Sequence, residues 1–227
     1  MNVNTRDYWE KRFATGDWEA KGGTQQTICF AETLVRYLNI LPSFSGSILD
    51  FGCGLGDAVA VYHEHFRCAS LIGVDITRAA IEKCRQRYSG IAEFVQCDYT
   101  EVPEADVIVS CAVFEHLSNQ MEVARHLLRK CGELYIVVPY KETLSPGSEH
   151  VNTYDETSFA ELGECDSTVF SSKGWTEYGL RLWVNVHAKN LLRFFFGRKL
   201  HRRRRMIMYR LIGEMCHSGA TCEKEMG

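Results

Sequence analysis

The chain has 227 residues, and 45% of them are hydrophobic, which suffices for one sizeable core and leaves little for a second. Its formal net charge of −3 is ordinary for a soluble protein. No apolar run approaches the roughly 20 residues needed to span a bilayer, which excludes an integral membrane protein.

The first 45 residues predict a helical portion that we expect to act as a lid on the rest of a single domain covering residues 1–227. Helices are expected over residues 5–13 and 27–38, with "ATGDWEAKGGTQQ" as a loop between them. The polar start "MNVNTRDYWEKR" lacks a secretory signal, and the ten cysteines include no Cys-x-x-Cys pair. These features predict a cytoplasmic protein with mostly free thiols.

Short apolar runs then alternate with segments of helical spacing. The runs are "SILDFG", "SLIGVD", "AEFVQCD", "DVIVSCAV" and "GELYIVVPY", and helical spacing appears between them, as in "TRAAIEKCRQRY" and "QMEVARHLLRKC". This alternation predicts an α/β fold with a parallel sheet covered by helices on both faces. A long loop, "YKETLSPGSEHVNTYDETSF", comes next, and then two weaker strand candidates, "STVFSSKGW" and "RLWVNVHA".

The loop after the first predicted strand carries three alternating glycines, Gly52, Gly54 and Gly56. Glycines there let the backbone turn tightly and approach a ligand closely at the carboxyl end of a parallel sheet. A dinucleotide fingerprint would place its third glycine at position 57, where an acid, Asp57, would oppose a pyrophosphate. Asp50 also suits an ammonium group better than a phosphate, so the loop favours S-adenosylmethionine over NAD.

Two further acidic residues lie at the carboxyl ends of predicted strands. Asp75 follows "LIGV" and can accept hydrogen bonds from ribose hydroxyls, and Asp98 follows "FVQC" and can accept one from an adenine amino group. Taken singly, each could instead be a strand-end turn or a helix N-cap. Because both lie at strand ends, we favour cofactor contacts over turns or N-caps for the two residues taken together.

The motifs "LDFGCGLGD", "GVDIT", "VQCDY", "VSCAVFEHL" and "GELYIVVPY" together resemble the class I S-adenosylmethionine-dependent methyltransferases, over residues 46–140. The start "YWEKRF", with Trp9, looks like the small-molecule and glycan members. The resemblance implies a Rossmann-like sheet of seven mostly parallel strands, whose last strand is antiparallel and to which "RLWVNVHA" would contribute one strand of the closing hairpin. It also implies these cofactor contacts: Trp9, Asp50, Gly52, Cys53, Gly54, Asp75, Ile76, Asp98, Tyr99 and Cys111.

Two histidines are candidates for the chemical step. Transfer to a hydroxyl requires a base beside it, and His116, just past the fourth strand, has the right type and place. His116 could instead hold its loop shut through a hydrogen bond. His150, in the long loop after the fifth strand, is the second candidate.

A second resemblance concerns metal ions. Glu115, His116 and His150 fall where magnesium-assisted O-methyltransferases, which read Glu-x-x-Glu-His, have ligands. The first Glu position is Ala112 here, which removes one oxygen ligand that magnesium favours. No bound metal is therefore expected.

The last predicted feature is a basic segment over residues 189–216. Residues 189–210 contain nine Lys or Arg and no acid, which leaves 17 basic and 29 acidic residues elsewhere, a net charge of −12. Apolar residues interleave with the cations and predict broken helices. The alternatives are a helix packed on the sheet with solvated arginines, or contact of Arg202, Arg203, Arg204 and Arg205 with an anionic membrane surface, a phosphorylated or lipid-linked substrate, or RNA.

The sequence thus predicts a methyltransferase that moves a methyl group from S-adenosyl-L-methionine to a hydroxyl, or less readily an amine, of a small molecule or glycan. "CAVFEH" lacks the Asn/Asp-Pro-Pro-Tyr motif of enzymes acting on nucleobase amines, so nucleic acid is less favoured. The alternatives are an RNA-directed methyltransferase and a non-catalytic subunit that binds the cofactor.

Overall fold

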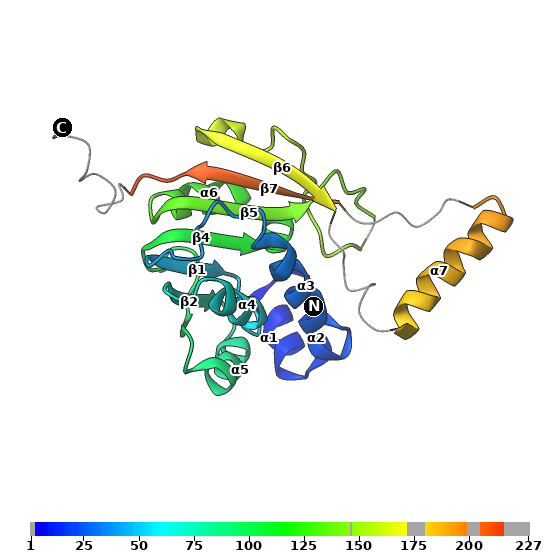
Figure 1. Ribbon diagram of the computed structural model, residues 1–227, viewed down its shortest axis with the longest axis horizontal. Coiled ribbons are helices and arrows are strands. Elements are labelled where there is room, and N and C mark those ends of the chain that lie inside the picture. The colour runs from blue at the N-terminus through cyan, green and yellow to red at the C-terminus, as the bar shows by residue number, and fades with distance from the viewer. Residues whose placement is uncertain (1–2, 146, 172–179, 199–204, 216–227) are drawn as a thin grey trace.

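The computed structural model describes residues 3–145, 147–171, 180–198 and 205–215 (Figure 1). Its helices are α1 (Arg6–Ala14), α2 (Asp17–Ala20), α3 (Gly23–Leu34), α4 (Asp57–His65), α5 (Arg78–Tyr88), α6 (Gln120–Leu128) and α7 (Leu180–Phe195), with short 3₁₀ turns η1 (Phe114–His116) and η2 (Ala160–Leu162). Its strands are β1 (Ser47–Phe51), β2 (Ser70–Asp75), β3 (Glu93–Gln96), β4 (Ala105–Cys111), β5 (Cys131–Pro139), β6 (Cys165–Ser171) and β7 (Arg205–Ile212).

The strands form one seven-stranded sheet in the order β3-β2-β1-β4-β5-β7-β6. Strands β1 to β5 pair in parallel, and β7 runs antiparallel to both β5 and β6. Order along the sheet reverses at β1, which lies between β2 and β4. The predicted α/β fold with a mostly parallel seven-stranded sheet and an antiparallel last strand is confirmed.

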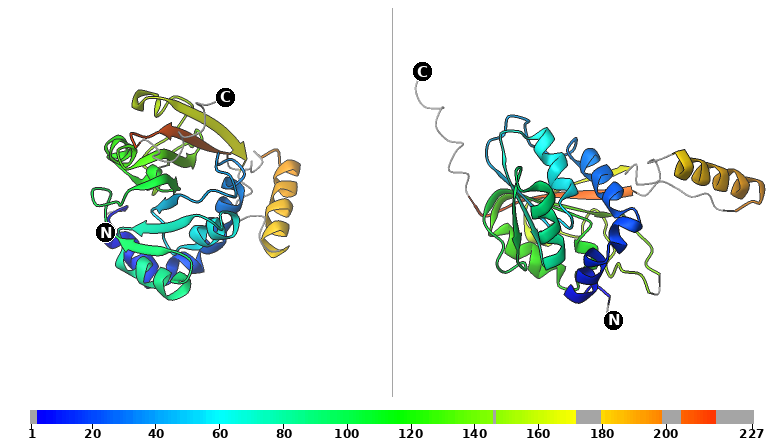
Figure 2. Two further views of the ribbon diagram at one scale, coloured as in Figure 1. Left: turned by 60° about the vertical axis from the view of Figure 1, so that its left-hand side comes forward. Right: turned by 90° about the horizontal axis from the view of Figure 1, so that it is seen from below.

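Helices cover both faces of the sheet, because successive strand residues point to opposite sides (Figure 2). Ile48 of β1 packs in the cluster that α3, α4 and α5 cover, and its neighbour Leu49 packs in the cluster under α6. The central strands are apolar at nearly every position because both of their faces are buried.

The N-terminal helices lie beside the carboxyl ends of the strands (Figure 1). Thr5 caps α1 by accepting a hydrogen bond from the Tyr8 amide at 3.3 Å, and the predicted first helix agrees with α1 within one residue at each end. The stretch expected to be a loop contains the short helix α2. The role of these helices as a lid stays a prediction.

Two predictions near the C-terminus are wrong. Residues 181–188, expected as a strand of the closing hairpin, are helical and belong to α7. Residues 205–212, expected as part of broken helices, form β7 between β5 and β6. Short apolar runs fit either a strand or a helix, so the local pattern does not decide between them.

The basic segment is only partly described. Arg202, Arg203 and Arg204 lie outside the described residues. Arg205 begins β7, and its guanidinium lies over the ring of Tyr140, 4.7 Å from the centroid.

Candidate active site

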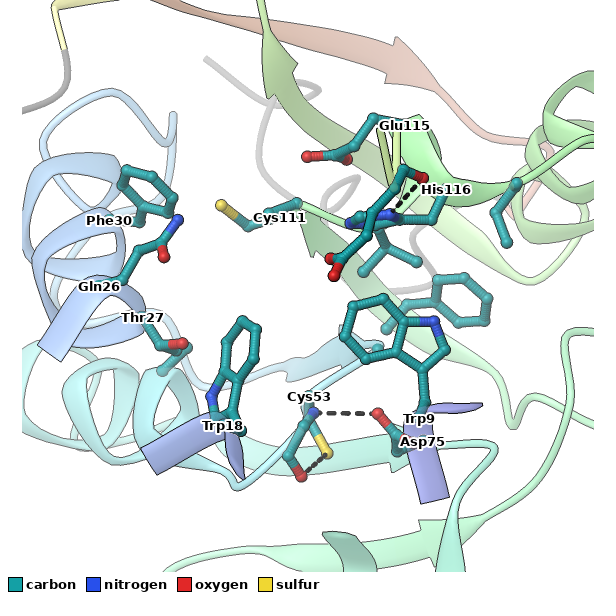
Figure 3. Close-up of a pocket in the computed structure, with 18 of the residues that line it drawn as sticks. Trp9, Trp18, Gln26, Thr27, Phe30, Cys53, Asp75, Cys111, Glu115 and His116 are labelled. Carbon is teal, nitrogen blue, oxygen red and sulfur yellow. Dashed lines mark hydrogen bonds between the residues drawn. The ribbon is translucent and has the colours of Figure 1, made fainter. Parts of the chain in front are cut away.

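A cavity of about 540 Å³ opens at the carboxyl ends of β1, β2 and β4. The loops after these strands form its floor, the N-terminal helices cover one side, and the loop after β5 closes the other. Figure 3 shows side chains from these separate segments pointing into the same space. This is the place where open parallel sheets bind ligands, at the point where strand order reverses.

The glycine loop shapes the floor. Gly52 has a φ of +79°, and a Cβ atom there would lie 2.4 Å from Cγ2 of Val113. The amides of Gly52 and Cys53 both donate to the carbonyl of Val74 at 2.9 Å, which fastens the loop to β2. Only a glycine fits this turn without strain or a clash.

Two carboxyl groups lie beside the loop, the buried Asp50 and the half-buried Asp75. Burial, and then the neighbouring Asp75, raise the pKa of Asp50 to about 7. Asp75 accepts hydrogen bonds from the Gly54 amide at 3.1 Å and from the Thr77 amide and hydroxyl at 2.9 and 2.7 Å. Burial is the largest influence on Asp75 and raises its pKa. A ligand with a cationic group and vicinal hydroxyls would compensate both carboxyls.

Three cysteines line the cavity, and two of them, Cys53 and Cys111, are predicted cofactor contacts. A hydrogen bond with Cys84 and burial raise the pKa of Cys53, and burial raises that of Cys111. Both thiols therefore stay protonated near neutral pH, which argues against a thiolate nucleophile at this site.

The structure brings together ten of the twelve residues predicted for the site. These residues line the cavity: Trp9, Asp50, Gly52, Cys53, Gly54, Asp75, Ile76, Cys111, His116 and His150. Their roles as cofactor contacts and catalytic residues stay predictions.

Asp98 and Tyr99 do not belong to the lining. Asp98 accepts hydrogen bonds from the amide and hydroxyl of Thr100, at 2.7 and 2.5 Å, which is the strand-end turn that the sequence left open as an alternative. Tyr99 donates its hydroxyl to Glu122 at 2.7 Å. Cys97, one residue before Asp98, lines the cavity instead.

Helix α1 and its neighbours supply lining residues that sequence reasoning missed, among them Arg12, Phe13, Trp18, Gln26 and Phe30. The clustering of aromatic residues in the N-terminal portion was the available signal. Glu10 anchors α1 to α5 by accepting from the amides of Arg78 and Ala79 at 2.8 and 3.0 Å. The N-terminal helices are thereby held against the domain beside the cavity.

His116 lies in η1 and is mostly enclosed. Its Nδ1 lies 3.1 Å from the carbonyl oxygen of Glu149. Since a carbonyl can only accept, Nδ1 carries the proton in this contact and Nε2 keeps its lone pair. Burial lowers the pKa of His116 to about 4, so it is neutral at physiological pH but a weaker base than its ordinary pKa of about 6.5 suggested.

His150 lies beside His116, with ring centroids 4.9 Å apart. Its Nδ1 contacts Oε2 of Glu142, and its amide donates to the Ser148 hydroxyl at 3.1 Å. A carboxylate beside one ring nitrogen orients the imidazole. His150 is thus held in place by the loop after β5.

Glu115, His116 and His150 also form a cluster of possible metal ligands. One ligand atom from each lies within 4.8 Å of the others, and Glu115 is buried. Two imidazoles and one carboxylate form a donor set more typical of Zn²⁺ than of Mg²⁺. Ala112, where a further carboxylate would be needed for the magnesium pattern, lines the same cavity. Metal-free chemistry stays a prediction.

A latch joins α1 to the loop after β5. We use "the Glu149 latch" for the contacts of Glu149 with Asn4, Tyr8 and Arg12. Nη1 of Arg12 lies 2.9 Å from both carboxylate oxygens of Glu149, and the Tyr8 hydroxyl contacts one of them. Asn4 donates to the Glu149 carbonyl at 2.5 Å, the same carbonyl that His116 contacts. The N-terminal segment therefore bears directly on the position of His116.

Comparison with known proteins agrees with this architecture. Residues 48–132 match a family described as a methyltransferase domain. The chain is 28% identical over 95 residues to a ubiquinone/menaquinone biosynthesis C-methyltransferase of Desulfotalea psychrophila, covering 41% of the chain and 37% of that relative. It is 25% identical over 175 residues to a malonyl-[acyl-carrier protein] O-methyltransferase of Paenibacillus sp., covering 72% of the chain and 59% of that relative. The chain thus spans between about a third and three fifths of these relatives' lengths.

The fold is similar to that of the plantazolicin methyltransferase BpumL, whose structure contains S-adenosylhomocysteine (SAH). The TM-score is 0.59 at 17% identity, covering 92% of this chain and 94% of that one. At this identity the likeness concerns the fold.

Proposed function

Because this chain contains a class I S-adenosylmethionine-dependent methyltransferase domain, we propose that it transfers the methyl group of that cofactor to an oxygen of a small molecule or glycan. The observation that supports this most is the arrangement of the cavity. Two carboxyls, the buried Asp50 and the half-buried Asp75, lie beside the glycine loop, and a neutral imidazole, His116, lies in the loop after β4. A cationic cofactor and a hydroxyl acceptor suit these two sets of groups.

The cofactor would lie along the carboxyl ends of β1 and β2. Ionised Asp50 would pair with its ammonium group, and Asp75 would accept from the ribose hydroxyls while it holds the Gly54 amide. Gly52 would let the backbone approach the methionine part. Trp9 and Phe13 stack with ring centroids 6.1 Å apart and would cover the cofactor from α1.

The acceptor would enter from the side formed by the loop after β5. Hydroxyl and carboxyl side chains of this loop line the cavity, namely Glu142, Thr143, Ser145, Ser148 and Glu149. Such a lining favours an acceptor with several hydroxyl groups, because each can donate to a carboxylate or exchange hydrogen bonds with a side-chain hydroxyl.

The chemical step is an in-line displacement. The cofactor, when bound, would supply the methyl group: the acceptor oxygen would bond to the methyl carbon while the bond from that carbon to sulfur breaks, leaving SAH. Nε2 of His116 orients the acceptor hydroxyl and receives its proton as the oxygen loses electron density to the methyl group. With a pKa of about 4, His116 takes this proton late, when the methylated oxygen has become strongly acidic.

Within the described residues, none of the eight cysteines is joined in a disulfide. Free thiols are typical of a reducing compartment, which supports a cytoplasmic location.

Binding experiments test the cofactor half of this proposal. Calorimetry should give heat from SAH and none from NAD. Asp75→Ala should weaken SAH binding about 5- to 150-fold, since up to two ribose hydrogen bonds of about 0.5–1.5 kcal/mol each are lost. Asp166→Ala, at a solvent-exposed aspartate on β6, is the matched control and should bind normally. Heat from NAD alone would contradict the proposal.

Methyl transfer tests the acceptor half. Methyl-labelled cofactor should label material in pools of small hydroxylated molecules, sugar nucleotides or lipid-linked glycans. Label appearing only in RNA would favour the RNA-directed alternative. Tight SAH binding without label in any pool would favour a non-catalytic subunit.

A further inference from the structure

Helix α7 stands apart from the rest of the protein. Figure 1 and the right panel of Figure 2 show it beyond the sheet, and among the described elements none packs closely on it. Its C-terminal half exposes Leu191, Leu192, Phe194 and Phe195 at 57–73% of their surface, and Phe196, just after it, at 75%. An apolar cluster of this size on a soluble domain marks an interaction surface.

The described residues of α7 divide into two faces. Leu191, Phe194 and Phe195 are spaced i, i+3, i+4 and therefore share one face. Lys189 and Arg193, four residues apart, lie on the opposite face. Phenylalanine and leucine on one face with lysine and arginine on the other is the pattern of helices that lie in a membrane interface.

The charge around this surface has one sign. From residue 180 to residue 213 the sequence contains no aspartate or glutamate, although the chain as a whole is net acidic. A second copy of α7 would bring like charges together, whereas an anionic surface would neutralise them. Aliphatic Leu191 and Leu192 beside the phenylalanines favour a lipid layer over nucleic acid, because bases stack on aromatic rings.

We propose that α7 docks this protein on the surface of an anionic lipid bilayer, with Leu191, Phe194 and Phe195 inserted among the acyl chains. Lys189, on the opposite face, lies towards the headgroups, and Arg198, just beyond the end of the helix, adds a second positive charge near them. No helix among the described residues is long and apolar enough to cross a membrane. The inference is independent of the acceptor, because none of the α7 residues lines the cavity.

Vesicle flotation with the full chain tests this proposal. The protein should float with phosphatidylcholine vesicles that contain phosphatidylglycerol and should stay behind with pure phosphatidylcholine vesicles. Phe194→Ser combined with Phe195→Ser should lower the partition coefficient about tenfold or more, since two buried aromatic side chains are lost. Lys189→Gln combined with Arg198→Gln should also lower it about tenfold, as should raising the salt to about 1 M.

A matched control separates docking from general surface hydrophobicity. Leu41 is 73% exposed and lies between α3 and β1, so Leu41→Ser should float like the wild type. All variants should keep the melting temperature and the SAH affinity of the wild type. These two measurements show that the domain stays folded when docking by α7 is lost. Light scattering should show a monomer.

Any of five outcomes would overturn the proposal. They are no flotation with anionic vesicles, equal flotation with neutral vesicles, equal loss in the Leu41 control, displacement of bound vesicles by RNA, and a dimer that the paired Phe substitutions dissociate. The last would assign the helix to self-association.

Discussion

Trp9 of α1 contacts His116 of η1 edge to face, with ring centroids 5.1 Å apart. The contact joins the N-terminal helices to the loop after β4, two segments that are distant in sequence. Because Trp9 also stacks on Phe13, one aromatic group extends from the glycine loop to the proposed proton acceptor. Cofactor binding and positioning of the acceptor are therefore expected to depend on the same lid.

His116→Ala should lower turnover by about 100-fold or more, because a positioned proton acceptor contributes at least that much. SAH affinity and the melting temperature should stay near those of the wild type. Steady-state rates, calorimetry and thermal melts check this. The control is His65→Ala, at an exposed position at the end of α4, which should turn over normally. Normal turnover of His116→Ala would remove it from the mechanism.

His116 also makes stability depend on pH. Its pKa is about 6.5 in an unfolded chain and about 4 in the folded one, so the folded state favours the neutral ring. Stability from this group is fully present above pH 6.5 and is lost as the pH falls from there towards 4. Urea unfolding across this range should show a smaller loss in His116→Ala than in the wild type. If the unfolding free energy of His116→Ala depended on pH as strongly as that of the wild type, burial of the ring would be contradicted.

Asp50 should make the affinity for the cofactor depend on pH around neutrality. Its pKa of about 7 means that the empty site is partly protonated at neutral pH, whereas an ammonium group favours the carboxylate. SAH affinity should therefore rise as the pH increases from about 5 to 8, with proton release on binding below pH 7. Calorimetry in buffers of different ionisation enthalpy measures this. Asp50→Asn should bind weakly and without this pH dependence.

Gly52→Ala should destabilise the protein by about 1–3 kcal/mol, since alanine at a φ of +79° is strained and its Cβ would overlap Val113. Cofactor binding should fall with it. Gly90→Ala is the control, because a Cβ there meets nothing within 4 Å. Urea unfolding should show little change in the control. Equal stability of the two variants would mean that the loop can shift.

The Glu149 latch predicts a coupling energy between Arg12 and Glu149 in the free energy of unfolding. A double-mutant cycle of Arg12→Gln and Glu149→Gln should give about 1 kcal/mol or more in unfolding free energy, because the Arg12 side chain is only 12% exposed. The exposed pair Arg125 and Glu161 is the matched cycle and should give less than about 0.5 kcal/mol. Equal couplings would show that the latch is an ordinary surface ion pair.

Removal of metal ions should leave turnover unchanged. Methyl transfer needs alignment and a proton acceptor, and Ala112 takes the place of one carboxylate of the magnesium pattern. Dialysis against EDTA, followed by a labelled-methyl assay, checks this. Loss of turnover that Zn²⁺ restores would instead assign Glu115, His116 and His150 to a metal centre.

The parallel half of the sheet could be predicted because its sequence signals are local. Ile48, Leu49 and the apolar runs of β4 and β5 are buried on both faces of the sheet, and the glycine loop marks the end of β1. The glycine loop and His116 could be placed in one cavity for the same reason, since strand ends of a parallel sheet meet at one edge.

The strand candidate at residues 167–175 overlaps β6, but β7 and α7 could not be predicted, because their local patterns fit both a helix and a strand. Methionine and leucine favour helices, yet Met206, Met208 and Leu211 are buried in β7 between two strands. Residues 181–188 contain valines that favour strands and are helical in α7. Asp98 is one residue away from a cavity-lining position, and no local pattern distinguishes its turn from a ligand contact.

The position of β7 has a consequence for the order of folding. Among the described strands it comes last in the sequence, but it lies between β5 and β6, and in the described sheet β6 pairs with β7 alone. While the chain leaves the ribosome, β6 emerges before the strand with which it must pair, and the edge of β5 stays open until residues 205–212 arrive. Nascent chains therefore expose the unpaired edges of β5 and β6, where aggregation begins, until β7 has been made.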